Sequence, residues 1–367
     1  MSRDIVTQIW QAGVDAVGGY AATQAALAKV TRPDQILAVG KAAGAMARAA
    51  LDRFDRAPCL VVTKDNHGQG LPAHARLIEA AHPVPDARSL TAGRALRDAV
   101  AALPAGSHLL LLVSGGASAL AEDPVPGHEL QDLIALNGRL LAAGLSIDQM
   151  NAQRRAVSQI KGGGLLSGFA GAQVTVLAIS DVPGDDLGVI GSGIGLAPDR
   201  PDMHADCRII ASNAIARQAA AAQARAMGLP VLAQDEALHD DLFDLAARLG
   251  PRLRAMDPGV MILGGEPTVV LPDTPGQGGR NQGLALAIAR EIAGQPGLTV
   301  LVGGTDGTDG PTQAAGGIVS GDTWGIGAES ALTAADSGPY LADRGALLIT
   351  GPTGTNVMDL LVAYRTH

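Results

Sequence analysis

Glycine and carboxylate residues gather in one segment of the chain, and this segment is well suited to bind a ligand. Residues 303–317 read GGTDGTDGPTQAAGG and follow the apolar run 298–302. Glycine lets a backbone approach a ligand closely, while Asp306 and Asp309 offer the hard oxygen ligands that Mg²⁺ takes beside substrate phosphates. The same residue types build ordinary surface turns. The repeated TDG unit favours a binding site.

Two further glycine-rich segments lie where apolar runs end and could hold an anion. ILAVGKAAGA places Lys41 before an Ala-rich helix, where the helix dipole disfavours a cation unless an anion compensates it. LLLLVSGGASAL offers backbone N–H groups and hydroxyls to a phosphate, although it is neither a Walker P-loop nor a GxGxxG fingerprint. A solvated lysine and a helix-capping serine are the plain alternatives. The predicted phosphate-binding residues of these segments are Gly40, Ser114, Gly115, Gly116 and Ser118.

Charged side chains also follow other predicted strands or flank predicted helices. Asp181 comes directly after the run 174–179, where it could hold Mg²⁺ or orient a hydroxyl. Arg280 stands where a glycine loop enters a helix, and its planar guanidinium suits bidentate binding of phosphate or carboxylate. For Lys161, completing a helix dipole is a strong alternative. The predicted substrate-binding residues are Arg155, Lys161 and Asn281, and Glu266 joins Asp306 and Asp309 as a predicted metal ligand.

Composition narrows the class of protein. A formal charge of −9 and a pI near 5.3 argue against nucleic acid as the partner. Two cysteines without paired spacing, Cys59 and Cys207, favour a reduced, cytoplasmic setting. No apolar stretch approaches the roughly twenty residues that span a bilayer. His82 lies between a predicted strand and helix near the same predicted sheet edge, where it could line a cleft, and a simple loop histidine is the favoured alternative. No histidine pair has the HExxH spacing of a metal site.

The elements that must position these residues alternate between strand and helix. A length of 367 residues favours two domains, and the βαβα rhythm is typical of a doubly wound parallel sheet. We expect a first domain over 1–250, a second, smaller α/β domain over 256–355, and a carboxyl-terminal helix over 356–367. The expected strands are 36–39, 58–63, 77–80, 108–113, 174–179, 208–211, 260–263, 267–271, 298–302 and 346–350. The expected helices are 4–28, 42–53, 86–100, one from Ser118, 130–164, 213–227, 236–248 and 281–293.

Taken in order, these segments resemble the glycerate 2-kinase family, in which a Rossmann-like domain precedes a domain called MOFRL. The resemblance spans almost the whole chain. It rests on VGKAAGAMA, HPVPD, LVSGGASAL, NAQRRAVSQIKGGGL, ISDVPGDD, LGGEPTV, GGRNQGLALAIA, GGTDGTDGPTQAAGG and TGTNVMDLLV. Two positions depart from the family pattern, because members often carry an acid where this chain has Gln313 and Glu where it has Gly283.

The resemblance implies an ATP-dependent kinase that phosphorylates D-glycerate at its 2-hydroxyl with Mg²⁺, in a cleft between two domains. Lys41 and Arg280 match positions that the family uses in catalysis, and Asp181 joins them as a hypothesis. Gly303, Gly304 and Thr305 match a nucleotide or phosphate element. Glycerate and ATP are thus the expected partners, with no nucleic acid and no membrane, and a homodimer is left open.

Two other classes of function compete with a kinase. Relatives have been named hydroxypyruvate reductases of tartrate or glyoxylate degradation, and an NAD(P)H-dependent enzyme would bind a dinucleotide. The chain lacks the GxGxxG fingerprint with a downstream acid for the ribose, so a reductase would rest on fold analogy. A non-catalytic protein that binds an organic acid or a nucleotide is the other alternative, and it would not need so many polar residues at strand ends.

Overall fold

The computed structural model describes residues 2–142 and 147–366, and the chain divides into two compact units. Residues 18–212 and 354–356 form the first, which we call the parallel-sheet unit. The remaining segments, up to 17, 213–353 and from 357 onward, form the second, which we call the mixed-sheet unit. None of the described helices combines the length and the apolar character needed to cross a membrane.

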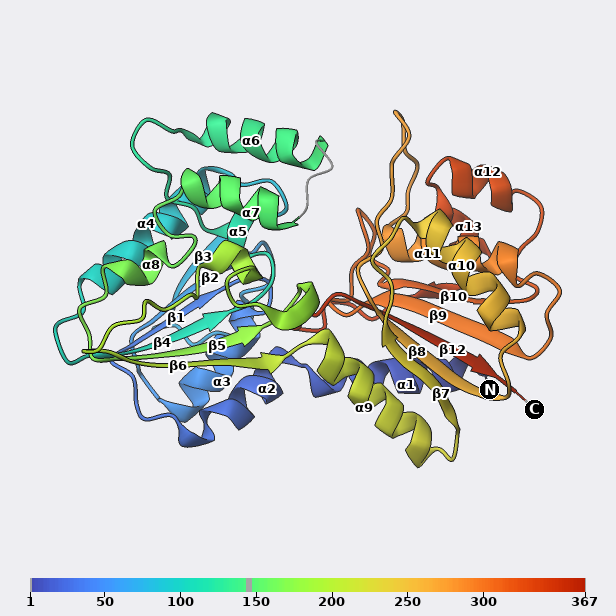
Figure 1. Cartoon of the computed structure of the whole chain (residues 1–367), viewed down its shortest axis with the longest axis horizontal. Helices are drawn as coiled ribbons and strands as arrows, with labels where there is room; N and C mark the ends of the chain where they lie inside the picture. The colour runs from blue at the N-terminus through green and yellow to red at the C-terminus, as the bar shows by residue number, and fades with distance from the viewer. Residues whose placement is uncertain (1, 143–146, 367) are drawn as a thin grey trace. The chain divides into compact units, whose positions relative to one another are not determined.

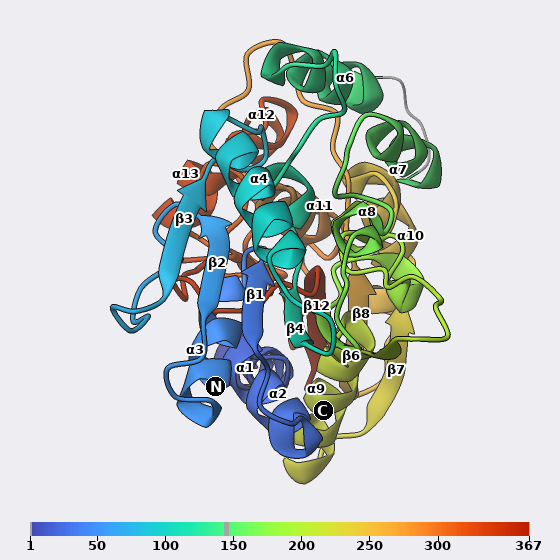
Figure 2. The same cartoon turned by 90° about the vertical axis from the view of Figure 1, so that its left-hand side faces the viewer.

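The parallel-sheet unit is built on six parallel strands in the order β3-β2-β1-β4-β5-β6. This is the strand order of a Rossmann fold, whose ligands bind where the order reverses, beside β1 and β4. Figure 2 shows β3, β2, β1 and β4 side by side in that order. The strands are β1 (Gln35–Val39), β2 (Cys59–Lys64), β3 (Arg76–Ala80), β4 (His108–Val113), β5 (Gln173–Ile179) and β6 (His204–Ala211).

Helices cover both faces of this sheet, so its central strands read as unbroken apolar runs. Every residue of β4 is buried, as expected for a parallel strand with helices on both sides. In Figure 1, α2 and α3 lie on one face of the sheet and α4 and α8 on the other. The helices are α2 (Gly19–Ala26), α3 (Ala43–Arg53), α4 (Ala87–Ala101), α5 (Ala117–Leu120), α6 (Leu130–Ala142), α7 (Ile147–Ala156) and α8 (Gly164–Ser167).

The mixed-sheet unit has the strand order β11-β10-β9-β12-β8-β7, in which β7 and β8 alone pair in parallel. The antiparallel β12 lies between β8 and β9 and begins where both of them end, since Asp359 pairs with Gly265 and Gly304. The strands are β7 (Val231–Glu236), β8 (Gly259–Gly265), β9 (Leu298–Gly304), β10 (Gly316–Ser320), β11 (Leu347–Leu348) and β12 (Asp359–Arg365).

Helices from separate parts of the chain cover the two faces of the mixed sheet. The α11 helix packs on β9 and β10, whereas α1 and α9 pack on β9, β12, β8 and β7. Trp10 of α1 is fully buried, and its Nε1 donates a hydrogen bond to the carbonyl of Gly303 over 3.3 Å. The helices are α1 (Ser2–Ala16), α9 (Asn213–Ala226), α10 (Leu242–Arg254), α11 (Arg280–Glu291), α12 (Ala328–Thr333) and α13 (Ser337–Asp343).

Three predicted helices differ from those in the structure. The helix expected over 4–28 breaks at Gly18, whose ψ of 126° is not helical, and its two parts belong to different units. The helix expected over 130–164 corresponds to two helices, α6 and α7, and α7 ends at Ala156, before a turn in which Gly162 and Gly163 have positive φ. Residues 143–146 of that range lie outside the described residues. The helix expected from Ser118 is the four-residue α5, which is too short for a helix dipole to hold an anion.

Three predicted elements in the second half of the chain also differ from the structure. The helix expected over 236–248 is α10, which starts after β7 and continues through the predicted boundary at Pro251 because its apolar face packs throughout. The strand expected over 267–271 is a loop that holds one isolated bridge at Thr268. The carboxyl-terminal helix expected over 356–367 is strand β12. Apolar runs buried on both faces show no helical or strand period to distinguish them.

We expect Trp10→Ala to destabilise the mixed-sheet unit by about 3 to 5 kcal/mol, because it removes a large buried side chain and leaves a cavity. Trp10→Phe keeps most of the volume and should cost much less. The measurement is urea unfolding of each variant, followed by hydrogen exchange of the β9 and β12 amides to locate the loss. Equal stability of Trp10→Ala and wild type would show that α1 does not support this sheet.

Candidate active site

Lys41 lies where the strand order of the parallel sheet reverses. Gly40 follows β1 with a φ of +126°, and a side chain there would clash with Ser114, which follows β4. The Lys41 N–H donates to the carbonyl of Gly115 over 2.9 Å, and the Ser114 hydroxyl accepts the Ala42 N–H at the start of α3 over 3.0 Å. The two predicted phosphate-binding loops are therefore joined by hydrogen bonds at one edge of the sheet.

His82 and Lys41 both face Gly116, the left-handed residue of the second loop. A Cβ on Gly116, which has a φ of +82°, would lie 3.1 Å from the Lys41 side chain and 3.1 Å from the His82 ring. Glycine at this position thus leaves room for both side chains. A simple loop histidine was the favoured interpretation of His82, with a place in the cleft as the alternative. Its position after β3 is the sequence signal for that alternative.

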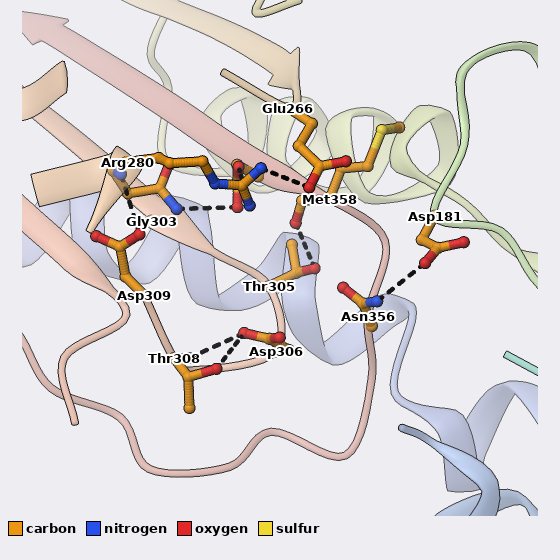
Figure 3. A network of polar contacts seen from close by, with 12 residues as sticks. Asp181, Glu266, Arg280, Gly303, Thr305, Asp306, Thr308, Asp309, Asn356 and Met358 are labelled. Atoms are coloured by element: carbon orange, nitrogen blue, oxygen red, sulfur yellow. Dashed lines mark hydrogen bonds and ion pairs between the residues drawn. The ribbon is translucent and has the colours of Figure 1, made fainter. Parts of the chain in front are cut away.

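Asp181 belongs to the same sheet edge, directly after β5. Its Oδ2 accepts a hydrogen bond from Nδ2 of Asn356 over 3.3 Å (Figure 3). A side chain on Gly115 would overlap both groups, because its Cβ would lie 2.0 Å from Asp181 Oδ2 and 2.3 Å from Asn356 Nδ2. Asp181 therefore packs on the glycine loop that Lys41 also contacts.

Ser118 is linked to two buried polar residues. Its hydroxyl lies 2.9 Å from the Ser192 hydroxyl, which donates to Oδ1 of Asn151 over 2.9 Å. Ser192 has a φ of +58° between two left-handed glycines, a conformation that costs free energy for a residue with a side chain. Ser118 thus does more than begin a helix, and its hydroxyl is held by a second serine.

Of the two predicted cationic substrate ligands, Lys161 is buried and paired. It forms an ion pair with Glu122, which also accepts the Ser158 hydroxyl, and both charged side chains are 4% exposed. Burial lowers the pKa of Lys161, while the Glu122 carboxylate opposes that shift. This position corrects the substrate-binding prediction, because the ammonium faces a carboxylate in the interior. Arg155 is half-buried and packs its side chain over Gly162.

In the mixed-sheet unit, Arg280 begins α11 among carboxylates (Figure 3). Its Nη1 lies 2.5 Å from Glu266 Oε1, and its Nη2 lies 3.7 Å from Asp359 Oδ2. The Arg280 and Glu266 side chains are 38% and 47% exposed, whereas that of Asp359 is 5% exposed. One side of the guanidinium therefore faces a buried acid, and the other an acid in contact with water.

Asp309 and Asn281 form hydrogen bonds that hold the start of α11 and the residues around Arg280 in place. Both oxygens of Asp309 accept backbone N–H groups of α11, from Asn281 over 3.1 Å and from Gln282 over 2.8 Å. These bonds satisfy the free amides of a helix start, and Gly279 is required because a Cβ there would lie 2.1 Å from the Asp309 carboxyl carbon. The buried Asn281 side chain, predicted to bind substrate, donates to Asp359 Oδ1 over 2.9 Å.

The three predicted metal ligands are not brought together as a metal centre. Glu266 pairs with Arg280, Asp309 caps α11, and Asp306 accepts the N–H and hydroxyl of Thr308 in a local turn. Within residues 2–142 and 147–366, no three His, Cys, Asp or Glu side chains are placed to hold a metal ion. A magnesium ion would therefore need ligands from a substrate as well.

Gly303 and Gly304 end strand β9, and Thr305 follows them in a hydrogen-bonded turn. The Gly304 N–H donates to Ala315 over 2.8 Å, and the Thr305 N–H donates to Met358 over 3.1 Å. Thr305 is fully buried, and its hydroxyl donates to the Met358 carbonyl over 2.6 Å (Figure 3). These amides pair within the unit, so the predicted phosphate contact lacks donors there. Gly303 and Gly304 were predicted to lie in a loop, although strand β9 continues to Gly304.

Burial and charge act against each other around Arg280. Burial raises the pKa of Asp359 to about 7, although Arg280 opposes the shift. Burial also raises the pKa of Asp309, against the N–H groups of Gln282 and Asn281. For Arg280, burial lowers the pKa, but Asp359 and Glu266 outweigh it and the net shift is upward. The guanidinium is thus a permanent cation beside an acid that titrates near neutral pH.

Asp359 was not among the residues predicted for the site. It was present in the quoted segment TGTNVMDLLV, before the run that forms β12. Had that run been read as a strand, Asp359 would have been placed at a strand end with the other candidates. Because a helix was predicted over 356–367, Asp359 was not recognised as a residue at the start of a strand.

Two family models match the chain one after the other. A family model described as a domain of unknown function, DUF4147, matches residues 5–227, and the MOFRL family model matches residues 259–359. A sheet with the Rossmann strand order and a segment that matches the MOFRL family place the chain in the class of two-domain α/β proteins with a MOFRL domain. The chain belongs to the glycerate 2-kinase family, as the following relatives show.

The D-glycerate 2-kinase of Thermotoga maritima is 34% identical, with 98% of this chain and 97% of that protein covered. A crystal structure of glycerate kinase from Thermotoga maritima has a TM-score of 0.86 at 32% identity and covers 99% of each chain. A protein of Agrobacterium vitis that carries a hydroxypyruvate reductase name is 36% identical, with 89% of this chain and 97% of that protein covered.

We expect Asp359→Asn to change how stability depends on pH. Asp359 has a folded pKa of about 7, against about 3.9 in an unfolded chain. Between these values the folded state binds the extra proton, so the free energy of unfolding of the wild type falls as pH rises, by at most about 1.4 kcal/mol per pH unit. Asp359→Asn should lack this fall.

Urea unfolding from about pH 4 to about pH 7 measures this difference. Asp343→Asn, at an exposed position of the same unit, is the matched control and should follow the wild type. Parallel curves for Asp359→Asn and wild type would contradict the raised pKa.

We expect Lys161→Met to cost about 3 to 5 kcal/mol of stability, because it leaves the Glu122 carboxylate buried without its cation. Combining Lys161→Met with Glu122→Gln removes the stranded charge and keeps the acceptor of the Ser158 hydroxyl, so the double variant should lose less. Denaturant unfolding of the wild type, both single variants and the double variant gives the coupling. Additive losses would refute the importance of the pair.

Proposed function

We propose that the protein is a glycerate 2-kinase that transfers the γ-phosphoryl group of ATP to the 2-hydroxyl of D-glycerate. Family membership supports the kinase class, and the observation that carries the proposal is Lys41 among the joined loops at the reversal point of the Rossmann sheet. Phosphoryl transfer depends on positioning and charge neutralisation rather than on a covalent intermediate. A fixed cation beside glycine loops suits that chemistry.

Each candidate side chain is assigned a role in this proposal. Lys41 neutralises charge on the transferring phosphoryl group, while Gly115 and Gly116 let the substrate approach the backbone. Arg280 binds an anionic group of the nucleotide. Asp181 orients the 2-hydroxyl, because a carboxylate at the same sheet edge can accept its hydrogen bond.

Mg²⁺ fits this arrangement as an ion bound with the nucleotide. Its preferred site combines one or two carboxylates with phosphate oxygens and waters, and Asp181 or Asp306 would supply the carboxylate. When bound, the ion would neutralise charge on the phosphates. The cleft between two domains and the homodimer stay predictions. A reduced, cytoplasmic setting is part of the proposal, supported by Cys59 and Cys207, which are free thiols.

A reductase is the alternative to be excluded, because a relative from Agrobacterium vitis carries the name of a hydroxypyruvate reductase. Incubation with D-glycerate, ATP and Mg²⁺, with phosphorus NMR of the products, identifies the phosphoglycerate isomer. Oxidation of NADH with hydroxypyruvate is measured in parallel. Formation of 2-phosphoglycerate supports the proposal, and NADH consumption without ADP formation refutes it.

We expect Lys41→Ala and Arg280→Ala each to lower kcat/KM by about a hundredfold or more, because each removes a charge that stabilises a transferring phosphate. Lys29→Ala, at an exposed position of the parallel-sheet unit, and Arg290→Ala, at the far end of α11, are matched controls that should keep near-normal activity. Steady-state kinetics with both substrates varied provides the measurement. Near-normal turnover of both Lys41→Ala and Arg280→Ala would end this assignment.

A further inference from the structure

An apolar cavity of about 300 Å³ opens beside Arg280 in the mixed-sheet unit. Its walls come from the start of α10, the loop between β8 and α11, the first turn of α11 and the turn between α12 and α13. In Figure 1 the loop between β8 and α11 is long and stands away from its own sheet. All residues that line the cavity lie within the mixed-sheet unit.

The cavity exposes apolar side chains that folding covers elsewhere. The chain has three phenylalanines, of which Phe54 and Phe169 are 5% and 0% exposed. Phe243, in the cavity wall, is 38% exposed, and Val270 and Leu271 are 86% and 57% exposed. A cluster of exposed apolar side chains around a concavity is typical of a ligand site. An aromatic ring there can stack on a flat ligand.

The charge of the lining defines the other part of the ligand. Among the cavity's lining residues, all of them described, Arg280 alone is charged. The guanidinium keeps contact with water, and its outer partner Glu266 is 47% exposed and can be displaced by another anion. The cavity therefore fits a ligand with a flat apolar part and an anionic part.

Glycine shapes the floor of the cavity. Gly283 lies one turn after Arg280 on the same helix, and an added Cβ would meet Leu242 at 3.0 Å. Glycine at this position lets Leu242 pack close to the backbone of α11, so that both residues form the apolar floor. Glycerate offers no apolar face to such a surface, since each of its three carbons carries oxygen. A nucleotide offers both a planar base and phosphates.

We propose that this cavity binds the base of the phosphoryl-donor nucleotide, with Phe243 against the base and Arg280 on the phosphates. The inference rests on the proposed kinase function and deepens it by assigning the nucleoside to the mixed-sheet unit. Lys41 and its glycine loops are then left to the phosphoryl acceptor and the transferred group.

Phe243→Ala tests the proposal in the full-length protein. Loss of base stacking should raise the KM for ATP about tenfold, with the KM for glycerate unchanged. Phe243→Tyr keeps a ring and should restore the KM for ATP. Ile326→Ala removes an apolar side chain that is 98% exposed and outside the cavity, so its kinetics should match the wild type.

Inhibition separates the base from the phosphates. Adenosine should compete with ATP in the wild type, and its inhibition constant should rise about tenfold in Phe243→Ala. Inhibition by tripolyphosphate, which has no base, should be the same in both proteins. Urea unfolding of each variant confirms that the compared proteins are folded.

The two proposals fail in different ways. An active kinase in which Phe243→Ala leaves both the KM for ATP and adenosine inhibition unchanged overturns the base site but not the kinase function. Absence of glycerate phosphorylation in the wild type overturns the kinase function. Calorimetric binding of adenosine to wild type but not to Phe243→Ala would then support the base site, and equal binding to both would overturn it.

Discussion

The hydrogen bonds between the buried carboxylate of Asp309 and the first amides of α11 fix the place of Arg280. Burying a carboxylate is costly unless its oxygens are satisfied, and here both oxygens accept N–H groups that a helix start would otherwise leave unpaired. The hairpin loop between β9 and β10 and the helix α11 thereby hold each other. Arg280, the first residue of that helix, inherits its position from the contact.

Strand direction supplies the second half of the arrangement. Because β12 runs antiparallel to β8 and β9, its first residue lies at the edge where those strands end. Asp359 therefore reaches the start of α11 from a central strand, and Asn281 joins the two by donating to it. In a fully parallel sheet the start of a central strand would lie at the opposite edge. The mixed topology is thus what brings a buried acid to Arg280.

The sequence predicted the strands of the parallel-sheet unit well, because a strand covered on both faces is an apolar run, and the runs of β1 and β4 end in glycine loops. The candidates Lys41, Ser114 and Asp181 were placed near strand ends in this way. The mixed-sheet unit was harder to predict, since the choice between strand and helix for 359–365 depends on pairing with β8 and β9, which lie far away in the sequence. Asp309 was predicted to be a metal ligand because it carries a carboxylate in a glycine-rich segment. Its capping role depends on α11, which local patterns cannot place.

The polar cluster around Arg280 combines a rigid part with an exchangeable part. Asp359 and Asn281 are buried, so removing either would leave a polar partner without compensation in the interior. Glu266 is close to half exposed, and water can replace its contact with Arg280 at little cost. A phosphate could therefore displace Glu266 while Asp359 keeps the guanidinium in place. The Arg280 guanidinium that a nucleotide would contact is thus held in place by Asp359, and its ion pair with the exposed Glu266 can be exchanged.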